Sequence, residues 1–312
     1  QAEDGIRDVE RSRGLGDVYK RQVIGFGGLG YFVGFSQIWV CFFMILFAGL
    51  LSWIVLGERT RAMSSNLGVM TVPSLLGARY ESKFLQALAS IIVCLFFIPY
   101  VVAVYKAVGS TFEAFLGIPY SISIAVIGIV ITLYLTMGGM LSVLINDFIN
   151  GWLICIGVVA VFIATYTMLG GFTEAHLKLG AISPFHVNMV PLSHPFFLKV
   201  IVGYSVVTGL GAWAWPHLST RFITARDRKS IIRSVPIATV FLFIASTVGT
   251  VPCILSRVLF HEHGMSFTPA QMDVIYPVFV KTFMPAAIAW IFALGVVGAC
   301  ISTIDAMLHV AG

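Results

Sequence analysis

The chain has 312 residues, of which 58% are hydrophobic and only 11% are charged, and its mean hydropathy is +0.95. Soluble domains carry about a quarter charged residues, so this composition excludes a soluble globular protein and indicates that lipid is the solvent. The net charge of +5 comes from 19 Lys and Arg that lie in a few short loops, which argues against nucleic acid as a partner. The five cysteines stand singly within apolar runs without CxxC spacing, so we expect buried thiols.

Residues 1–22 differ sharply from the rest of the chain. They hold ten charged residues and no apolar run, and they directly precede a stretch without charge from Val23 to Gly57. A signal peptide would need an apolar middle, and a transit peptide would lack acids. Residues 1–8 and 12–22 can be back-translated into the constant parts of a sequencing-library adapter, with residues 9–11 covering the variable index. We therefore predict that residues 1–22 are translated adapter and that 23–312 are a fragment of one transmembrane domain.

Seven apolar windows after this leader are long enough to span a membrane. A spanning helix needs about 20 mostly apolar residues. Charge-free windows of that length occur at 38–57, 84–105, 114–146, 148–173, 200–220, 234–256 and 282–304. A shorter apolar piece, from Val23 to Phe32, precedes them. We expect about seven full spans, with the third trimmed by glycine near both ends.

Loop charges predict the orientation of these spans. Lys and Arg concentrate in the loop after the first full span, which contains Arg59, and in the loop after the fifth, which contains Arg226. Cytoplasmic loops carry such an excess, so both loops are expected to face the cytoplasm. The loop from Phe172 to Pro195 is then outside.

Three ionisable residues fall within or beside the spans. A charge at the centre of a bilayer costs about 2.5 to 3.5 kcal/mol on insertion scales, so each needs a partner or a function. Asp147 has an interfacial cap as its structural alternative, and Asp305 lies late in the seventh span. Lys106 is expected to extend its amine to the headgroups as a structural residue.

Two local patterns indicate chemistry. Ser302 and Thr303, with the carbonyl of Ala299 one turn earlier, offer oxygen ligands to a hard cation such as sodium, although such hydroxyls usually bond back to their own helix. The fifth span contains Gly209, Gly211 and Pro216. Such residues interrupt helices at transporter binding sites, but a glycine-packed helix with an aromatic end is an equal alternative.

Four blocks together resemble the sodium:solute symporter family, which includes proline, pantothenate and sodium/glucose carriers. The segment Gly34 to Trp39 looks like the opening of the helix that follows the broken first core helix. Gly138 and Gly139, followed by Asn146, Asp147 and Asn150, resemble the family's GG…TD..Q signature, with Asn in place of Thr and of Gln. The remaining blocks resemble GLG…QPH…RF and AxxST and comprise Gly209, Gly211, Trp215, Pro216, His217, Arg221, Phe222, Ala299, Ser302 and Thr303.

The resemblance implies an all-α integral membrane protein with a LeuT-type inverted-repeat helix bundle. The chain would hold an incomplete bundle, from part of core helix 1 through core helix 8. Sodium would be bound by Ala299, Ser302 and Thr303, with Asp147 assisting its passage on the cytoplasmic side. Further sodium ligands of the family lie upstream of Val23, so we expect this fragment by itself not to transport.

By the same resemblance, Gln37, Tyr100 and Thr208 would face the solute cavity, with Trp213 close to its gate. The implied function is a sodium-coupled symporter, not an enzyme, that takes up a small organic solute by alternating access without another cofactor. A vitamin, amino acid, carboxylate or sugar all remain open as the solute, and the oligomeric state is unassigned. The expected location is the cytoplasmic membrane of a prokaryotic cell, in multi-pass form.

Two alternatives stay open at this point. A proton-coupled carrier of the same fold would use Asp147 and Asp305 as intramembrane carboxylates. A symporter-like input domain of a membrane histidine kinase would look the same over these residues.

Overall fold

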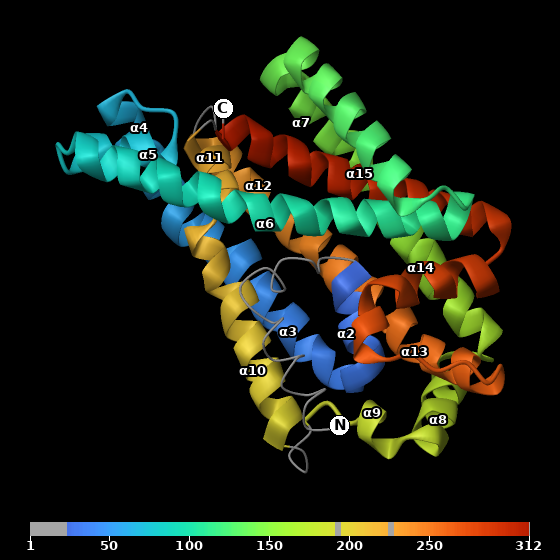
Figure 1. Ribbon diagram of the computed structural model, residues 1–312. Helices are drawn as coiled ribbons and strands as arrows, with labels where there is room; N and C mark the ends of the chain where they lie inside the picture. The colour runs from blue at the N-terminus through green and yellow to red at the C-terminus, as the bar shows by residue number, and fades with distance from the viewer. Residues whose placement is uncertain (1–23, 191–194, 224–227, 312) are drawn as a thin grey trace, which may run out of the picture.

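The computed structural model describes residues 24–190, 195–223 and 228–311, some of them by their backbone alone. The predicted adapter-encoded segment 1–22 lies outside this range. The described residues form helices without a strand (Figure 1). In chain order these are α2 (Ile24–Val33), η1 (Gly34–Ser36), α3 (Gln37–Phe43), η2 (Met44–Leu51), η3 (Trp53–Gly57), α4 (Glu58–Leu67), α5 (Val72–Arg79), α6 (Lys83–Leu116), α7 (Tyr120–Met168), α8 (Phe172–Ile182), α9 (Pro184–Val187), α10 (Pro195–Gly209), η4 (Gly211–Ala214), α11 (Pro216–Ile223), α12 (Arg228–Leu242), η5 (Phe243–Val248), α13 (Gly249–Glu262), η6 (Pro269–Gln271), α14 (Met272–Phe283) and α15 (Ala286–Ala311).

Long apolar helices match the predicted spans. Four stretches are long and apolar enough to cross a membrane within the described residues, namely Gly27–Leu67, Lys83–Leu116, Ile149–Met168 and Val235–Glu262. Three shorter apolar helices coincide with the remaining windows, at Tyr120–Leu133, Leu198–Ala214 and Ala286–Ile301. The all-α membrane fold is therefore confirmed, whereas the count of seven full spans stays a prediction.

One helix differs from the predicted division of the chain. The windows 114–146 and 148–173 were expected to be separate spans, but α7 is helical without interruption from Tyr120 to Met168. Glycine lowers helix propensity but keeps the backbone N–H that proline lacks. Gly138 and Gly139 therefore do not end the helix.

The core is centred on α13. Every residue from Gly249 to Ser256 is buried, and so are those from Val258 to Phe260, which is typical of a helix enclosed by protein on all sides. The cluster of buried hydrophobic side chains around α13 joins it to α2, α8, α14 and the second half of α7. In Figure 1, α13 and α2 lie together in the lower half of the molecule, while α6 crosses in front of α15.

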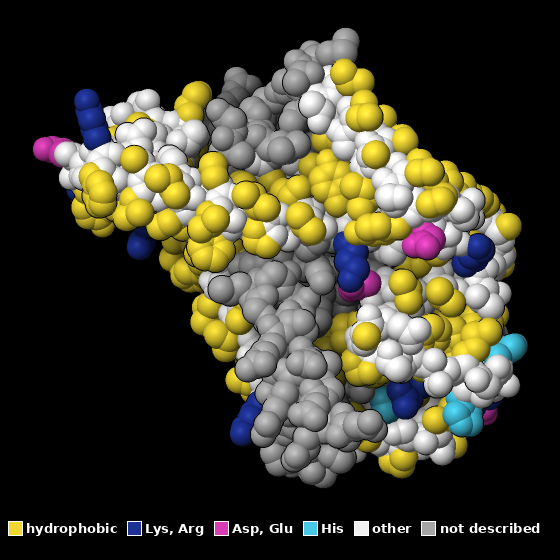
Figure 2. Space-filling view, in the orientation of Figure 1, with side chains coloured by type: hydrophobic (Ala, Val, Ile, Leu, Met, Phe, Trp, Pro, Cys, Tyr) yellow, Lys and Arg dark blue, Asp and Glu magenta, His cyan; other side chains and the backbone are white. Residues whose placement is uncertain are grey.

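The outer surface is apolar, as expected for contact with lipid tails. Figure 2 shows hydrophobic side chains over much of the drawn face, with only a few charged side chains among them. Along α6, Phe84 is 77% exposed and Ile98 is 64% exposed. Cys94 is also exposed on α6, contrary to our expectation, whereas Cys41 and Cys253 are buried.

The first span is bent and irregular. Gly34 has a φ of +67° between α2 and α3, and a Cβ atom there would lie only 2.5 Å from the Cα of His186. After α3 the chain forms two π-helical segments, η2 and η3. Such segments frequently occur at functional sites in helices, so this span combines a kink with a loosened helical backbone.

Candidate functional site

The fifth predicted span, for which the sequence left an interrupted and a continuous helix open, is broken in the structure. The α-helix α10 ends at Gly209, and a short 3₁₀ segment, η4, follows. Trp215 is then extended, with φ −71° and ψ 118°, before Pro216 starts α11. Proline cannot donate to a preceding turn but fits the first position of a helix, which explains why α11 begins there.

A pocket of about 310 Å³ opens beside this break. It is lined by apolar and aromatic residues of α6, the break and α15, namely Ile92, Val93, Phe96, Phe97, Pro99, Tyr100, Gly211, Ala214, Trp215, Pro216 and Met307. Tyr100 is only 6% exposed. Of the predicted solute-facing residues, Tyr100 therefore lines a concave apolar site of the kind that binds small molecules.

The other three predicted solute-facing residues gather at a different contact, between the first span and α10. Gln37 is fully buried at the start of α3, and Thr208 is 4% exposed on α10. The Thr208 hydroxyl donates to the carbonyl of Tyr204 at 2.7 Å. Trp213 donates its indole N–H to the carbonyl of Phe47 in η2 at 2.8 Å. Of these three residues, Trp213 makes the hydrogen bond that joins the interrupted helix to the irregular first span.

Two of the predicted sodium ligands lie close together on α15. The Thr303 hydroxyl donates a hydrogen bond of 2.9 Å to the carbonyl oxygen of Ala299. This is the hydrogen bond within one helix that the sequence analysis gave as the structural alternative to sodium binding. It uses the hydroxyl hydrogen and a lone pair of the carbonyl oxygen, so the Thr303 hydroxyl oxygen keeps its own lone pairs to accept or to coordinate. Two oxygens of the kind that hard cations prefer thus lie within 2.9 Å of each other, and their role as sodium ligands stays a prediction.

This part of α15 packs very closely on the second half of α7. A Cβ atom at Gly295 would lie 3.0 Å from the Cα of Ile154, and one at Gly157 would lie 3.0 Å from the Cα of Phe292. A Cβ at Gly298 would collide with the side chain of Asn150, which is buried. Glycines let helix backbones approach in membranes, and here they place Asn150 next to the residue that precedes Ala299.

Several predicted residues cannot be tested in this way. The side chains of Asp147, Ser302, Asp305, His217 and Arg221 lie outside the described residues. The same holds for the surroundings of Gly138 and Gly139, whose backbones belong to α7. The ligand role of Ser302 and the passage role of Asp147 stay predictions.

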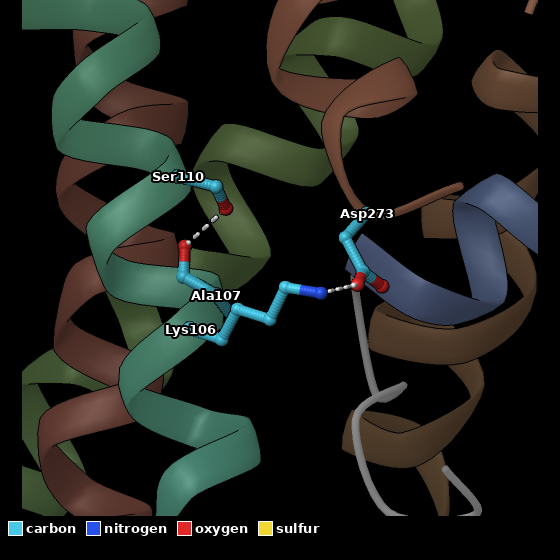
Figure 3. Close-up of polar contacts among 4 residues, drawn as sticks. All are labelled: Lys106, Ala107, Ser110 and Asp273. Carbon is cyan, nitrogen blue, oxygen red and sulfur yellow. Dashed lines mark hydrogen bonds and ion pairs between the residues drawn. The ribbon is translucent and has the colours of Figure 1, made fainter. Parts of the chain in front are cut away.

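Lys106 has a specific partner rather than only headgroups. Its amine lies 3.4 Å from a carboxylate oxygen of Asp273, so it joins α6 to α14 (Figure 3). The Lys106 side chain is 45% exposed and that of Asp273 19%, and exposed pairs contribute little to stability. The pair links a pocket-lining helix to the segment that covers α2 on the predicted outer side.

A buried histidine anchors the predicted outer loop. His186 in α9 is 6% exposed, and its Nδ1 lies 2.8 Å from the hydroxyl of Ser183. Burial, together with the positive charge of Arg257, lowers the pKa of His186 from 6.5 to about 4, although the carbonyl of Phe32 acts in the opposite direction. His186 is therefore neutral at physiological pH beside the Gly34 kink.

Some lining residues were not found by sequence reasoning. Met307 and Phe97 enter the pocket although neither has a recognisable motif. Trp215 was predicted only as part of a family block, not as a residue that lines a pocket. Its position directly before Pro216 was the available signal, because the residue before proline is extended and can turn a large ring away from the helix axis.

Long apolar helices around an interrupted helix and a pocket define a multi-span membrane protein of the transporter type. A model of the sodium:solute symporter family matches residues 16–312. The chain belongs to the sodium:solute symporter family. The match starts within the segment predicted to be adapter-encoded, and the boundary at residue 22 stays a prediction.

Curated relatives of this chain are named as symporters or transporters. The osmoregulated proline transporter of Bacillus subtilis is 23% identical over 302 residues, which are 96% of this chain and 60% of the relative. The sodium/pantothenate symporter of Haemophilus influenzae is 25% identical over 90% of this chain and 57% of its own length. That of Escherichia coli is 29% identical over 71% of this chain and 46% of its own length. The chain thus spans between about half and three fifths of these relatives.

Proposed function

We propose that this protein is a sodium-coupled symporter that takes up a small organic solute across the cytoplasmic membrane of a prokaryotic cell by alternating access. The observation that carries the proposal is the pair of oxygens at Ala299 and Thr303 on α15, in a chain of the sodium:solute symporter family. The names of its relatives support sodium with proline or pantothenate as first solutes to test.

The proposed mechanism needs binding and positioning only. Sodium would bind at the Ala299 carbonyl and the Thr303 hydroxyl, with Ser302 as a further ligand. The solute would bind near the break between α10 and α11, where Tyr100 and Trp215 line the pocket. Each sodium ion that crosses contributes about 2.3 kcal/mol per 100 mV of membrane potential, which is about fifty-fold accumulation.

The test is uptake by the full-length protein in liposomes. Radiolabelled L-proline and pantothenate are offered with an inward sodium gradient, a proton gradient or neither. We expect uptake with the sodium gradient, and Thr303→Ala should raise the sodium concentration for half-maximal uptake by about tenfold, as expected for a lost ligand of about 1.4 kcal/mol.

A matched control separates ligation from helix stability. Thr165 on α7 is buried and makes the same bond to its own helix, at 2.7 Å to Val161. Thr165→Ala should leave the sodium dependence unchanged. Uptake that follows the proton gradient instead, or sodium dependence unaltered by Thr303→Ala, would contradict the sodium assignment.

A further inference from the structure

One side of α6 carries an exposed apolar stripe. Its members are large hydrophobic side chains spaced three or four residues apart, namely Phe84, Leu88, Ile91, Leu95, Ile98 and Val102. Such spacing places them on one face of the helix, and each is at least 40% exposed. Figure 2 shows hydrophobic side chains along this helix. The stripe covers about 27 Å at 1.5 Å per residue, which is close to the hydrocarbon thickness of a bilayer, about 30 Å.

A lysine stands beyond each end of this stripe. Lys83 directly precedes Phe84 on the predicted cytoplasmic side, and Lys106 follows Val102 by one turn on the predicted outer side. Because the stripe matches the thickness of the hydrocarbon layer, the two amines lie at the levels of the two headgroup layers.

The positive charges at the two ends are neutralised differently. The Lys106 amine lies 3.4 Å from a carboxylate oxygen of Asp273 (Figure 3). At the other end Arg79 and Lys83 are both exposed, and neither forms an ion pair within the part of the chain that the structure describes, although Glu81 lies between them. The described residues thus provide a carboxylate partner for the stripe's outer lysine but none for the two cations at its cytoplasmic end.

The turn between α5 and α6 keeps these two cations together. Ser82 donates its backbone N–H to the Gly77 carbonyl at 3.0 Å. A Cβ atom at Gly77 would lie 2.7 Å from the Cβ of Gln86, so α5 packs directly against the first turns of α6. Arg79, in the last turn of α5, and Lys83, at the start of α6, are therefore held at the same end of the stripe.

Exposed aromatic rings stand next to both cations. Tyr80 follows Arg79 and is 66% exposed, and Phe84 follows Lys83 and is 77% exposed. Aromatic side chains of this kind are typical of the level where lipid headgroups meet the hydrocarbon layer. Two unpaired cations beside a long apolar stripe match the two parts of an acidic phospholipid, its phosphate and its acyl chain.

We propose that an anionic phospholipid of the cytoplasmic leaflet binds at the start of α6, with its phosphate at Arg79 and Lys83 and an acyl chain along the stripe. Basic side chains on the cytoplasmic side of a membrane attract acidic headgroups, and an acyl chain covers apolar side chains that would otherwise lack a defined partner. This inference goes beyond the proposed function and does not depend on the coupling ion or on the solute.

The test compares two lipids that have the same acyl chains and different headgroups. They are 1-palmitoyl-2-oleoyl-phosphatidylglycerol, which is anionic, and the corresponding phosphatidylcholine, which has no net charge. Native mass spectrometry of the full-length protein in detergent measures the affinity for each. The wild type should bind phosphatidylglycerol about tenfold more tightly, which is about 1.4 kcal/mol. The double variant Arg79→Gln with Lys83→Gln should reduce this preference to less than about threefold, because both cations at the phosphate are lost.

A matched double variant controls for net charge. Lys199 on α10 and Lys281 on α14 are also exposed, and neither is in an ion pair among the described side chains. Lys199→Gln with Lys281→Gln removes the same two charges and should leave the preference at about tenfold. Equal affinity of the wild type for the two lipids, or the same loss in both double variants, would overturn the proposal. Displacement of phosphatidylglycerol by an equal concentration of sn-glycerol 3-phosphate would overturn it too, because that anion has no acyl chain.

Hydrogen–deuterium exchange locates the lipid without any substitution. In nanodiscs of phosphatidylglycerol, backbone amides of residues 77–86 should exchange at least about threefold more slowly than in nanodiscs of phosphatidylcholine, because a bound headgroup stabilises this turn. Amides of α13, which is buried in the core, should exchange equally in both lipids. Equal exchange of residues 77–86 in the two lipids would contradict the proposed site.

Discussion

Two helix contacts of this molecule carry the candidate binding groups, and they are built differently. Where α7 meets α15, two uninterrupted helices approach through Gly157 and Gly295 until their backbones nearly touch. Where α3 meets α10, each helix is interrupted, by Gly34 and η2 on one side and by η4 on the other. Among the side chains that the structure describes, only the second contact has buried polar groups without a hydrogen bond. The comparison contrasts a closely packed pair of helices, which we propose positions the sodium ligands, with a pair whose helices are both interrupted.

The largest expected effect comes from the kink that starts α3. Gly34→Ala adds a Cβ where φ is +67° and His186 is in the way. We expect a loss of about 3 to 5 kcal/mol of stability, or failure to fold. Gly68 has nearly the same φ, +64°, with nothing within 4 Å, so Gly68→Ala should cost only about 1 kcal/mol. Equal melting temperatures for the two variants in nanodiscs would refute the proposed packing at Gly34.

The glycine contact of α7 and α15 gives the next effect. Gly295→Ala should destabilise by about 1 to 3 kcal/mol, because a Cβ 3.0 Å from backbone atoms of Ile154 and Leu153 forces the helices apart. Gly203 on α10 has open space around it, and Gly203→Ala should stabilise by about 0.5 to 1 kcal/mol. Thermal unfolding of both variants shows whether each substitution raises or lowers the stability. A stabilised Gly295→Ala would mean that this contact is looser than described.

Acid should destabilise the protein through His186, which packs against the Gly34 kink at the start of α3. The pKa of His186 is lowered to about 4 from 6.5, so the folded protein holds this residue neutral and the unfolded chain takes up the proton first. Its stability contribution is complete above pH 6.5 and is lost as the pH falls toward 4, by about 2 kcal/mol at pH 5.

Melting temperatures at pH 7.5 and pH 5 measure this loss. His186→Gln should reduce the dependence, whereas substituting the exposed His261 in the same way should not. A wild-type protein and a His186→Gln variant with the same pH dependence would exclude His186 as the cause.

The sequence predicted the helices better than their contacts. Charge-free windows located the long apolar helices, and glycine with proline located the break at residues 209–216, because these residues act locally on the backbone. The continuity of α7 could not be predicted in this way, since tertiary packing decides whether internal glycines interrupt a helix. The burial of α13 on all sides also depends on neighbours far away in sequence.

The candidate site was predicted only where its contacts are local in the sequence. Thr303 and Ala299 are one turn apart, so their contact follows from helix geometry alone. The bond from Trp213 to Phe47 was missed because it joins helices 166 residues apart in the chain. The lining of the pocket by Met307 likewise requires α15 to pass α6 at one particular level.

Hydrogen–deuterium exchange of the full-length protein in nanodiscs tests the contrast between the two contacts most directly. In sodium-free buffer, backbone amides of residues 37–51 and 205–216 should exchange on the order of tenfold faster than those of residues 150–165 and 286–301. Sodium with a transported probe, L-proline or pantothenate, should slow exchange in the first pair of segments and leave the second pair unchanged. Equal exchange in all four segments, or protection by sodium and solute confined to residues 150–165 and 286–301, would contradict the account.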